Sequence, residues 1–148
     1  MFVARRFLAF LAVLALLAGC GSPISVDRLD ARTVQRELTS NALTTGRLSG
    51  ATQIALRRLD LLTLWENDAP AAIRTLSRTV VELGGQPDIT FALAEIAFIE
   101  AERTNDRSYF LATVVYSYAF LFPTNPANRP DPFDPRLRTA ADLYNRAL

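Results

Sequence analysis

Apolar residues recur at three- and four-residue steps along most of this chain, and that spacing predicts an all-α fold. The sharpest stripe predicts one helix over 49–65, with Ser49 as its N-cap. Its apolar face comprises Ala51, Ile54, Ala55, Leu59, Leu62 and Trp65. Before it, the spacing over 27–38 is only roughly helical, and a helix is predicted there as well. Residues 40–50, rich in Ser, Thr, Asn and Gly, are predicted to form a loop.

A second stripe predicts a helix that begins after Asp68. Aspartate can cap a helix start, and Pro70 fits the first turn because no amide donor is needed there. Gly84 and Gly85 are predicted to end this helix, since glycine accepts the left-handed backbone of a helix C-terminus.

Two more helices are predicted over 86–103 and 107–122. The first is apolar nearly all round, which is typical of a helix that neighbours cover on both sides. The second has no charge from Tyr109 to Phe122, and we expect it to form the buried centre of the domain. The β-branched residues at 113–115 leave a strand there as an alternative.

Prolines crowd the segment 123–135, which we therefore expect to be extended or polyproline-like. Asp134 and Pro135 predict the start of a last helix over 136–148, with aspartate as the cap and proline in the first helical position. That helix stops in mid-pattern at Leu148, which predicts a sequence that has been cut short. A natural terminus that docks as a helix is the alternative.

Antiparallel helices joined by short turns predict about five helices stacked as hairpins. The helices that begin near residues 70 and 107 start about 37 residues apart, close to the spacing of tetratricopeptide repeats. Most signature residues of that repeat are missing, so only a TPR-like array is predicted. Along the chain, 20–48 is predicted as a tether and N-terminal segment, and 49–122 as the helical core.

The beginning of the chain has the three parts of a secretory signal peptide. Arg5 and Arg6 supply positive charge, an apolar run follows over 7–17, and small residues precede Cys20. The apolar run is about 12 residues long, whereas a bilayer-spanning helix needs roughly 20. A processed signal therefore fits this stretch better than a permanent transmembrane helix.

The sequence Leu17-Ala18-Gly19-Cys20 resembles the lipobox of bacterial lipoproteins. The resemblance implies that 1–19 is removed, that the Cys20 thiol receives a diacylglyceryl group, and that the new amine is acylated, as by palmitate. Two or more chains would anchor the protein to a membrane stably. Gly21 stands where aspartate commonly signals inner-membrane retention, so the resemblance favours the outer membrane, facing the periplasm. An ordinary signal peptide with a chance cysteine is the alternative.

Composition narrows the possible chemistry. The 148 residues include no histidine, which removes the commonest general base, every Ser-His or Cys-His pair and the usual zinc sites. Cys20 is the only cysteine, so no disulfide is predicted. Without Arg5 and Arg6, 14 basic and 15 acidic residues remain, which gives no basic excess for nucleic acid. No cofactor, metal or catalytic residue is predicted; only a carboxylate-based mechanism stays open.

Glu95 is the one carboxylate inside the apolar run of the third predicted helix. Such a residue can mark a functional site when it is buried. At the edge of the helix it would instead pair with an arginine such as Arg74 or Arg78, and we favour this second interpretation. Glu100 and Glu102 are expected to be solvated.

Tyr109, Thr113, Tyr116 and Ser117 form a stripe of hydroxyl-bearing side chains on the fourth predicted helix. The stripe could line a cleft for an aromatic or acyl ligand. Hydroxyls satisfied within a helix interface are commoner, and we favour that interpretation. The proline-rich segment with Phe133 could bind a partner. We favour the alternative, in which it crosses the surface of this domain or of a following one.

Six short blocks look like the N-terminal helical region of bacterial lipoproteins that continue into an α/β-hydrolase domain. The blocks are Ser40-Asn41-Ala42-Leu43, Leu56-Arg57-Arg58, Phe91-Ala92-Leu93-Ala94-Glu95, Tyr116-Ser117-Tyr118-Ala119-Phe120-Leu121-Phe122, Asp131-Pro132-Phe133-Asp134-Pro135-Arg136 and Asp142-Leu143-Tyr144-Asn145-Arg146. In that family the catalytic residues lie in the later domain, and none maps onto this chain.

Two hypotheses of function follow. In the first, the chain is a lipid-anchored envelope module and the N-terminal part of an esterase- or lipase-like lipoprotein, whose catalytic domain is absent from this sequence. In the second, it is a complete TPR-like lipoprotein that binds other proteins, as in envelope assembly. Whether the chain belongs to an enzyme is left open.

Overall fold

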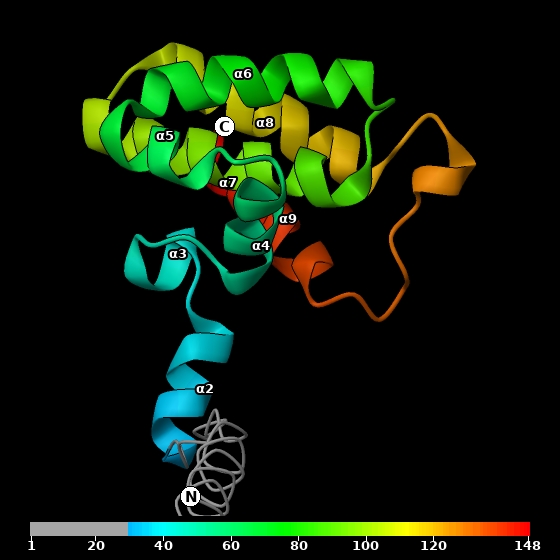
Figure 1. Ribbon diagram of the computed structural model, residues 1–148. Coiled ribbons are helices and arrows are strands. Elements are labelled where there is room, and N and C mark those ends of the chain that lie inside the picture. Colours follow the sequence, from blue (N-terminus) through cyan, green and yellow to red (C-terminus); the bar gives the residue numbers. More distant parts are fainter. Residues whose placement is uncertain (1–29) are drawn as a thin grey trace, which may run out of the picture. The chain divides into compact units, whose positions relative to one another are not determined.

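The computed structural model describes residues 30–148, apart from the side chains of 36–38. The predicted signal peptide and Cys20 lie outside these residues. In the described part, all regular structure is helical, which confirms the predicted all-α class (Figure 1). The helices are α2 (Ala31–Thr39), α3 (Ala42–Thr45), α4 (Gly50–Arg58), α5 (Leu62–Asn67), α6 (Ala69–Glu82), α7 (Pro87–Thr104), α8 (Arg107–Leu121), the 3-10 helix η1 (Pro126–Asn128) and α9 (Arg136–Ala147).

Helix α7 is the centre of the helical body. It packs against α4, α6, α8 and α9, and twelve of its residues are buried. The expectation that the 107–122 helix would be the buried centre is wrong, because α8 packs mainly on α7 and α9 and leaves its outer face exposed. Both helices are strongly apolar, so composition alone does not show which one is surrounded. The strand alternative at 113–115 is also wrong.

The helix predicted over 49–65 is in fact two helices, α4 and α5. Asp60 has a positive φ of 55°, and the amide of Leu61 donates to the carbonyl of Leu56 at 2.8 Å. This arrangement is a Schellman C-cap, in which a left-handed residue turns the chain out of the helix. Leu61 and Leu56 are both buried in the main core cluster, so their contact stabilises the turn.

The loop predicted over 40–50 contains a short helix, α3. Asn41 caps it, since its Oδ1 accepts from the amides of Leu43 and Thr44, and the Thr44 hydroxyl accepts from the Asn41 amide. Gly46 ends the helix with a φ of 67°. The Asn and Thr residues that suggested a loop form this capping box. In the described residues, α3, the α4–α5 break, α2 and η1 account for the helices beyond the expected five.

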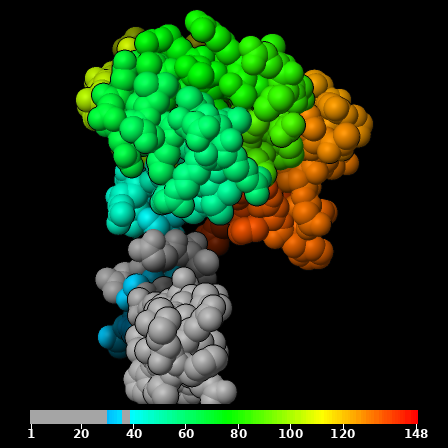
Figure 2. Space-filling model, in the orientation of Figure 1, coloured from blue at the N-terminus to red at the C-terminus, as the bar shows by residue number. Residues whose placement is uncertain are grey.

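The α6 boundaries are those that the sequence predicts. Asp68 Oδ1 accepts from the amide of Ala71 at 2.9 Å, and Pro70 lies in the first turn. Gly84 and Gly85 follow the helix with φ values of 66° and 75°. Figure 2 shows α4, α5 and α6 forming one continuous face of the molecule, with the proline-rich segment at its edge.

The proline-rich segment is tied to the α6–α7 turn. Asn128 Nδ2 donates to the carbonyl of Gly84 at 2.6 Å. The segment is not wholly extended, because η1 forms one turn within it. The N-cap of α9 is Pro135, which has no side-chain cap, so the prediction of Asp134 as the cap and Pro135 as the first helical residue is wrong by one position. Asp134 precedes the cap, and its Oδ1 accepts from the amide of Arg136 at 2.9 Å.

Candidate functional site

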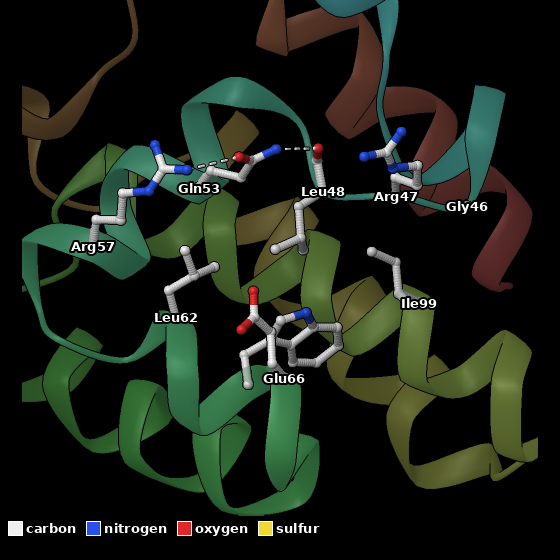
Figure 3. Close-up of a pocket in the computed structure, with 9 residues that line it drawn as sticks. Gly46, Arg47, Leu48, Gln53, Arg57, Leu62, Glu66 and Ile99 are labelled. Atoms are coloured by element: carbon white, nitrogen blue, oxygen red, sulfur yellow. Dashed lines mark hydrogen bonds between the residues drawn. The ribbon is translucent and has the colours of Figure 1, made fainter.

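An open groove lies where the α3–α4 loop, α4, α5 and α7 meet (Figure 3). Its volume is about 350 Å³. The lining residues are Gly46, Arg47, Leu48, Gln53, Arg57, Leu62, Trp65, Glu66 and Ile99. The turn at Asp60 ends α4 and lets α5 run in a new direction, so that the two helices both line the groove. We refer to it as the α5 groove.

The floor of the α5 groove belongs to the protein core. Leu48, Leu62 and Trp65 are partly buried and pack against the main core cluster. Figure 3 shows Leu62 and Ile99 directed into the groove from α5 and α7. The floor is therefore an apolar surface, packed on the core, that a ligand can cover.

Charged side chains border this apolar floor. Arg57 and Arg47 stand on opposite sides of the groove, with Gln53 between them (Figure 3). Arg57 donates to the neutral amide oxygen of Gln53 at 3.3 Å, and Gln53 Nε2 donates to the Leu48 carbonyl at 3.2 Å. Among residues 30–148, none of the ion pairs involves Arg47, Arg57 or Glu66. Both guanidinium groups thus have the capacity to bind a carboxylate of a ligand.

The groove continues past Trp65 and Glu66. A second hollow of about 520 Å³ shares these two residues and Ile99, and extends over 67–70 to Glu100 and Arg103. Together the two hollows follow the whole length of α5 along the side of α7. This elongated shape suits an extended chain better than a small compact ligand.

Glu100 is buried, so the expectation that it would be solvated is wrong. It is 1% exposed, and its carboxylate accepts two hydrogen bonds from Arg103, at 2.6 and 2.8 Å. The fork geometry of arginine satisfies both oxygens. Glu102, two residues further along α7, is half exposed as expected, and its carboxylate lies 3.5 Å from Arg146.

Glu95 is fully buried, and the interpretation that places it at a helix edge with Arg74 or Arg78 is wrong. Its Oε1 accepts from the amide of Ala42 at 3.0 Å. Its Oε2 accepts from the amide and hydroxyl of Ser49, at 3.1 and 2.7 Å. The carboxylate therefore holds the first turns of α3 and α4 against α7. Its place is structural, since it lines neither hollow of the α5 groove.

The hydroxyl stripe of α8 divides between helix interfaces and a second groove. Thr113 is buried and donates to the carbonyl of Tyr109 at 2.9 Å. The Tyr116 hydroxyl lies 3.2 Å from that of Ser77 and borders a hollow between α8 and the proline-rich segment. Ser117 Oγ is buried without a hydrogen-bond partner within the described structure. The structure does not gather these hydroxyls at one site.

Sequence reasoning missed the α5 groove. Arg47, Arg57 and Glu66 look like ordinary surface charges along the chain, and Trp65 looks like a core residue of a continuous helix. The one usable signal was an aromatic residue at the end of an apolar stripe that carries arginines beside it. Without the turn at Asp60, that signal does not predict a groove.

Comparisons with models of protein families, with curated protein sequences and with solved structures gave no match. The likeness to hydrolase lipoproteins and the lipobox stay predictions. Within residues 30–148, no helix combines the length and apolarity that crossing a membrane requires. In the same range, no group of three or more His, Cys, Asp or Glu side chains could hold a metal ion.

Proposed function

We propose that this chain is a lipid-anchored helical module of the bacterial cell envelope that binds an acidic segment of a partner protein in the α5 groove. The predicted anchor is Cys20, and the favoured location is the outer membrane, facing the periplasm. The observation that carries the binding role is the groove itself, whose apolar floor lies between two arginines that have no carboxylate partner in the described structure.

Complementary charge selects the occupant. A segment that alternates apolar and acidic residues could place apolar side chains over Leu62 and Ile99 and a carboxylate beside Arg57. Extended segments commonly bind in this way, with side-chain pockets supplying specificity. Glu66 lies further along the groove and would disfavour a second acid there. The groove is thus suited to acid at its α4 end.

A peptide titration tests the groove, because Trp65 is the only tryptophan and lines it. The probe is a short peptide of alternating leucine and glutamate, with a leucine and glutamine peptide as its control. We expect the acidic peptide alone to change Trp65 fluorescence. Replacing Arg47 and Arg57 by glutamine should weaken binding by roughly tenfold, since each exposed ion pair contributes under about 1 kcal/mol.

Arg78→Gln is the matched control, since Arg78 is an exposed arginine of α6 outside the groove. It should leave the affinity unchanged. Equal binding of both peptides, or equal losses in all arginine variants, would contradict the proposed binding role.

The anchor needs its own test. Cys20→Ser removes the predicted lipid acceptor, so the variant should leave the membrane fraction and lose the lipid mass at its N-terminus. Ser25→Ala, which keeps the lipobox intact, should remain with the membranes. A Cys20→Ser protein that stays bound to vesicles would rule out the anchor without affecting the groove.

A second candidate function is that of the N-terminal region of an α/β-hydrolase lipoprotein. It is favoured by where the six similar blocks lie, because several of them meet in the fold. Arg136 lies 5.7 Å from the ring of Phe91 and 5.5 Å from the ring of Phe120, and these three residues come from three blocks. Glu95 and Ala42, from two blocks, share a hydrogen bond. The residues that resemble the hydrolase lipoproteins thus include pairs that hold the helices together, as expected if the two share a helical framework.

The nucleotide sequence beyond codon 148 tests this second candidate. A continuing reading frame with a G-x-S-x-G motif and a later histidine would support it. An immediate stop codon, with neither feature downstream, would remove the hydrolase while leaving the anchored module intact.

A further inference from the structure

The outer face of α8 carries a row of large apolar side chains that stay more than half exposed, although one of them, Tyr118, also contacts Tyr144 of α9, with ring centroids 6.3 Å apart. The row consists of Leu111, Val115 and Tyr118 of α8 and of its C-cap Phe122, and these residues are 64%, 51%, 53% and 62% exposed. The opposite face of α8 is buried, through Thr113, Ser117 and Phe120. We call the exposed row the α8 stripe. Contiguous apolar surface of this kind marks a site of association.

The spacing of the α8 stripe is the same in both directions along the helix. Its steps are four, three and four residues, which is the spacing of a coiled-coil seam. When a second copy of α8 lies antiparallel, Leu111 comes opposite Phe122 of the second copy. Val115 then comes opposite Tyr118 of the second copy. Each contact pairs an aliphatic with an aromatic side chain, so the stripe is complementary to itself.

Charge also favours a second copy as the occupant. From Ser108 to Leu121 the helix has no charged residue, so two copies face each other without like-charge repulsion. The antiparallel arrangement brings the exposed Arg107 towards the C-terminal end of the other α8, where the helix dipole is negative. The neighbouring acid, Asp106, is already engaged within its own chain, because its carboxylate accepts from the amide and hydroxyl of Ser108, both at 2.8 Å.

We propose that two copies of this chain associate through an antiparallel contact between their α8 stripes, about a twofold axis between residues 116 and 117. The contact is isologous, as in most homodimers. It spans about three helical turns, which places it below the roughly 1,200 Å² of a standard interface and makes the dimer weak and reversible. The association depends neither on lipidation of Cys20 nor on the α5 groove.

Cysteine cross-linking in cells tests the register of the proposed dimer. The full chain is expressed with Leu111→Cys, with Phe122→Cys, or with both, and treated with an oxidant. The two positions are three turns, roughly 16 Å, apart on one helix, far beyond the limit of about 7 Å between bridged Cα atoms. A disulfide between positions 111 and 122 can therefore form only between copies. The double variant should give at least about tenfold more disulfide dimer than either single variant.

Three controls complete the experiment. The unsubstituted chain, with Cys20 alone, sets the baseline. Val81→Cys, at an apolar α6 position that is 78% exposed, should stay at that baseline. In the double-cysteine chain, Val115→Arg should abolish the cross-link and Val81→Arg should leave it unchanged. Because Val115 is half exposed, its variant should keep the helical circular dichroism of the parent chain.

Other outcomes would overturn the antiparallel dimer. Strong cross-linking of both single variants would indicate parallel helices. Baseline levels in the double variant, with unchanged circular dichroism, would show that the stripe faces a different partner domain or a lipid surface. A cross-link that survives Val115→Arg would place the contact elsewhere.

Discussion

Glu95 is the residue whose role depends most on the folded structure. In the sequence it is a single acid in an apolar helix, and no nearby basic residue explains it. In the fold it accepts hydrogen bonds from three donors that belong to a segment more than forty residues away. Sequence position could not reveal this, because the donors are mostly backbone amides, which leave no trace in residue type.

Glu95→Gln is expected to lower the free energy of unfolding by about 2–3 kcal/mol, because an amide group would face donors that need an acceptor. Glu102→Gln, on the same helix but half exposed, should change it by less than about 1 kcal/mol. Urea denaturation measures both values. Hydrogen exchange at the amides of Ala42 and Ser49 should accelerate in the Glu95 variant alone. Equal losses in the two variants would show that the buried carboxylate holds nothing in place.

Asp134 links the stability of the protein to pH. Its carboxylate, 11% exposed, accepts side-chain hydrogen bonds from Arg136, and these hold the pKa of Asp134 below its ordinary value. The stabilisation is therefore complete above the unfolded pKa of about 3.9, and is lost as the pH falls through the lower folded pKa. Asp134→Asn should lower the free energy of unfolding by about 1–2 kcal/mol at pH 7.

The difference between wild type and the Asp134 variant should shrink as the pH falls below about 4, because both proteins then lack the charged acceptor. Denaturation curves at several pH values measure this change. Asp142→Asn, at an exposed position of α9, should cost less than about 0.5 kcal/mol. A constant difference down to pH 2 would mean that Asp134 is not the group that titrates.

Element boundaries follow local chemistry unevenly. The start of α6 was predictable, because an aspartate that can cap the helix is followed by a proline that fits only its first turn. The end of α4 was not, because Asp60 adopts a left-handed backbone that usually requires glycine. What stabilises it is the burial of Leu61 beside Leu56, which is a tertiary effect. The α5 groove depends on this turn, so the groove was unpredictable for the same reason.

The turn after α6 offers a direct test of backbone geometry. Gly84 has a φ of 66° and open space around the position of a Cβ. Gly84→Ala should therefore destabilise the protein by about 1 kcal/mol through strain alone, without a steric clash. Gly50, in the first turn of α4, has equal space and an ordinary φ. Gly50→Ala should be neutral or stabilising by up to about 1 kcal/mol.

Thermal unfolding of the two glycine variants measures the difference. If alanine costs the same at both positions, the α6 C-cap does not hold the left-handed backbone. If Gly50→Ala is the more costly change, crowding at the start of α4 must exceed the strain at Gly84, contrary to the open space around both.

The described molecule has three apolar clusters that α7 connects. Leu93 and Ile96 belong to the main cluster, Phe98 to a second with Leu143, and Phe91 to a third with Phe120. The all-α class was predictable from periodicity, yet this connection was not, because α7 and α8 have similar apolar content. Only the arrangement of neighbours gives α7 the central place and leaves the α8 stripe exposed.

A shared central helix predicts that residues 31–148 unfold as one cooperative unit, which Trp65 can report. Trp65 packs on the main cluster, whereas Leu143 lies fully buried in the second one. Leu143→Ala should lower the free energy of unfolding by about 2–5 kcal/mol. If α7 couples the clusters, the Trp65 fluorescence transition must shift as far as the far-ultraviolet circular dichroism transition does. Leu148→Ala, at a position 80% exposed, should move neither. A Trp65 midpoint that stays fixed while the dichroism transition moves would mean that the clusters melt separately, and that α7 connects them without coupling them.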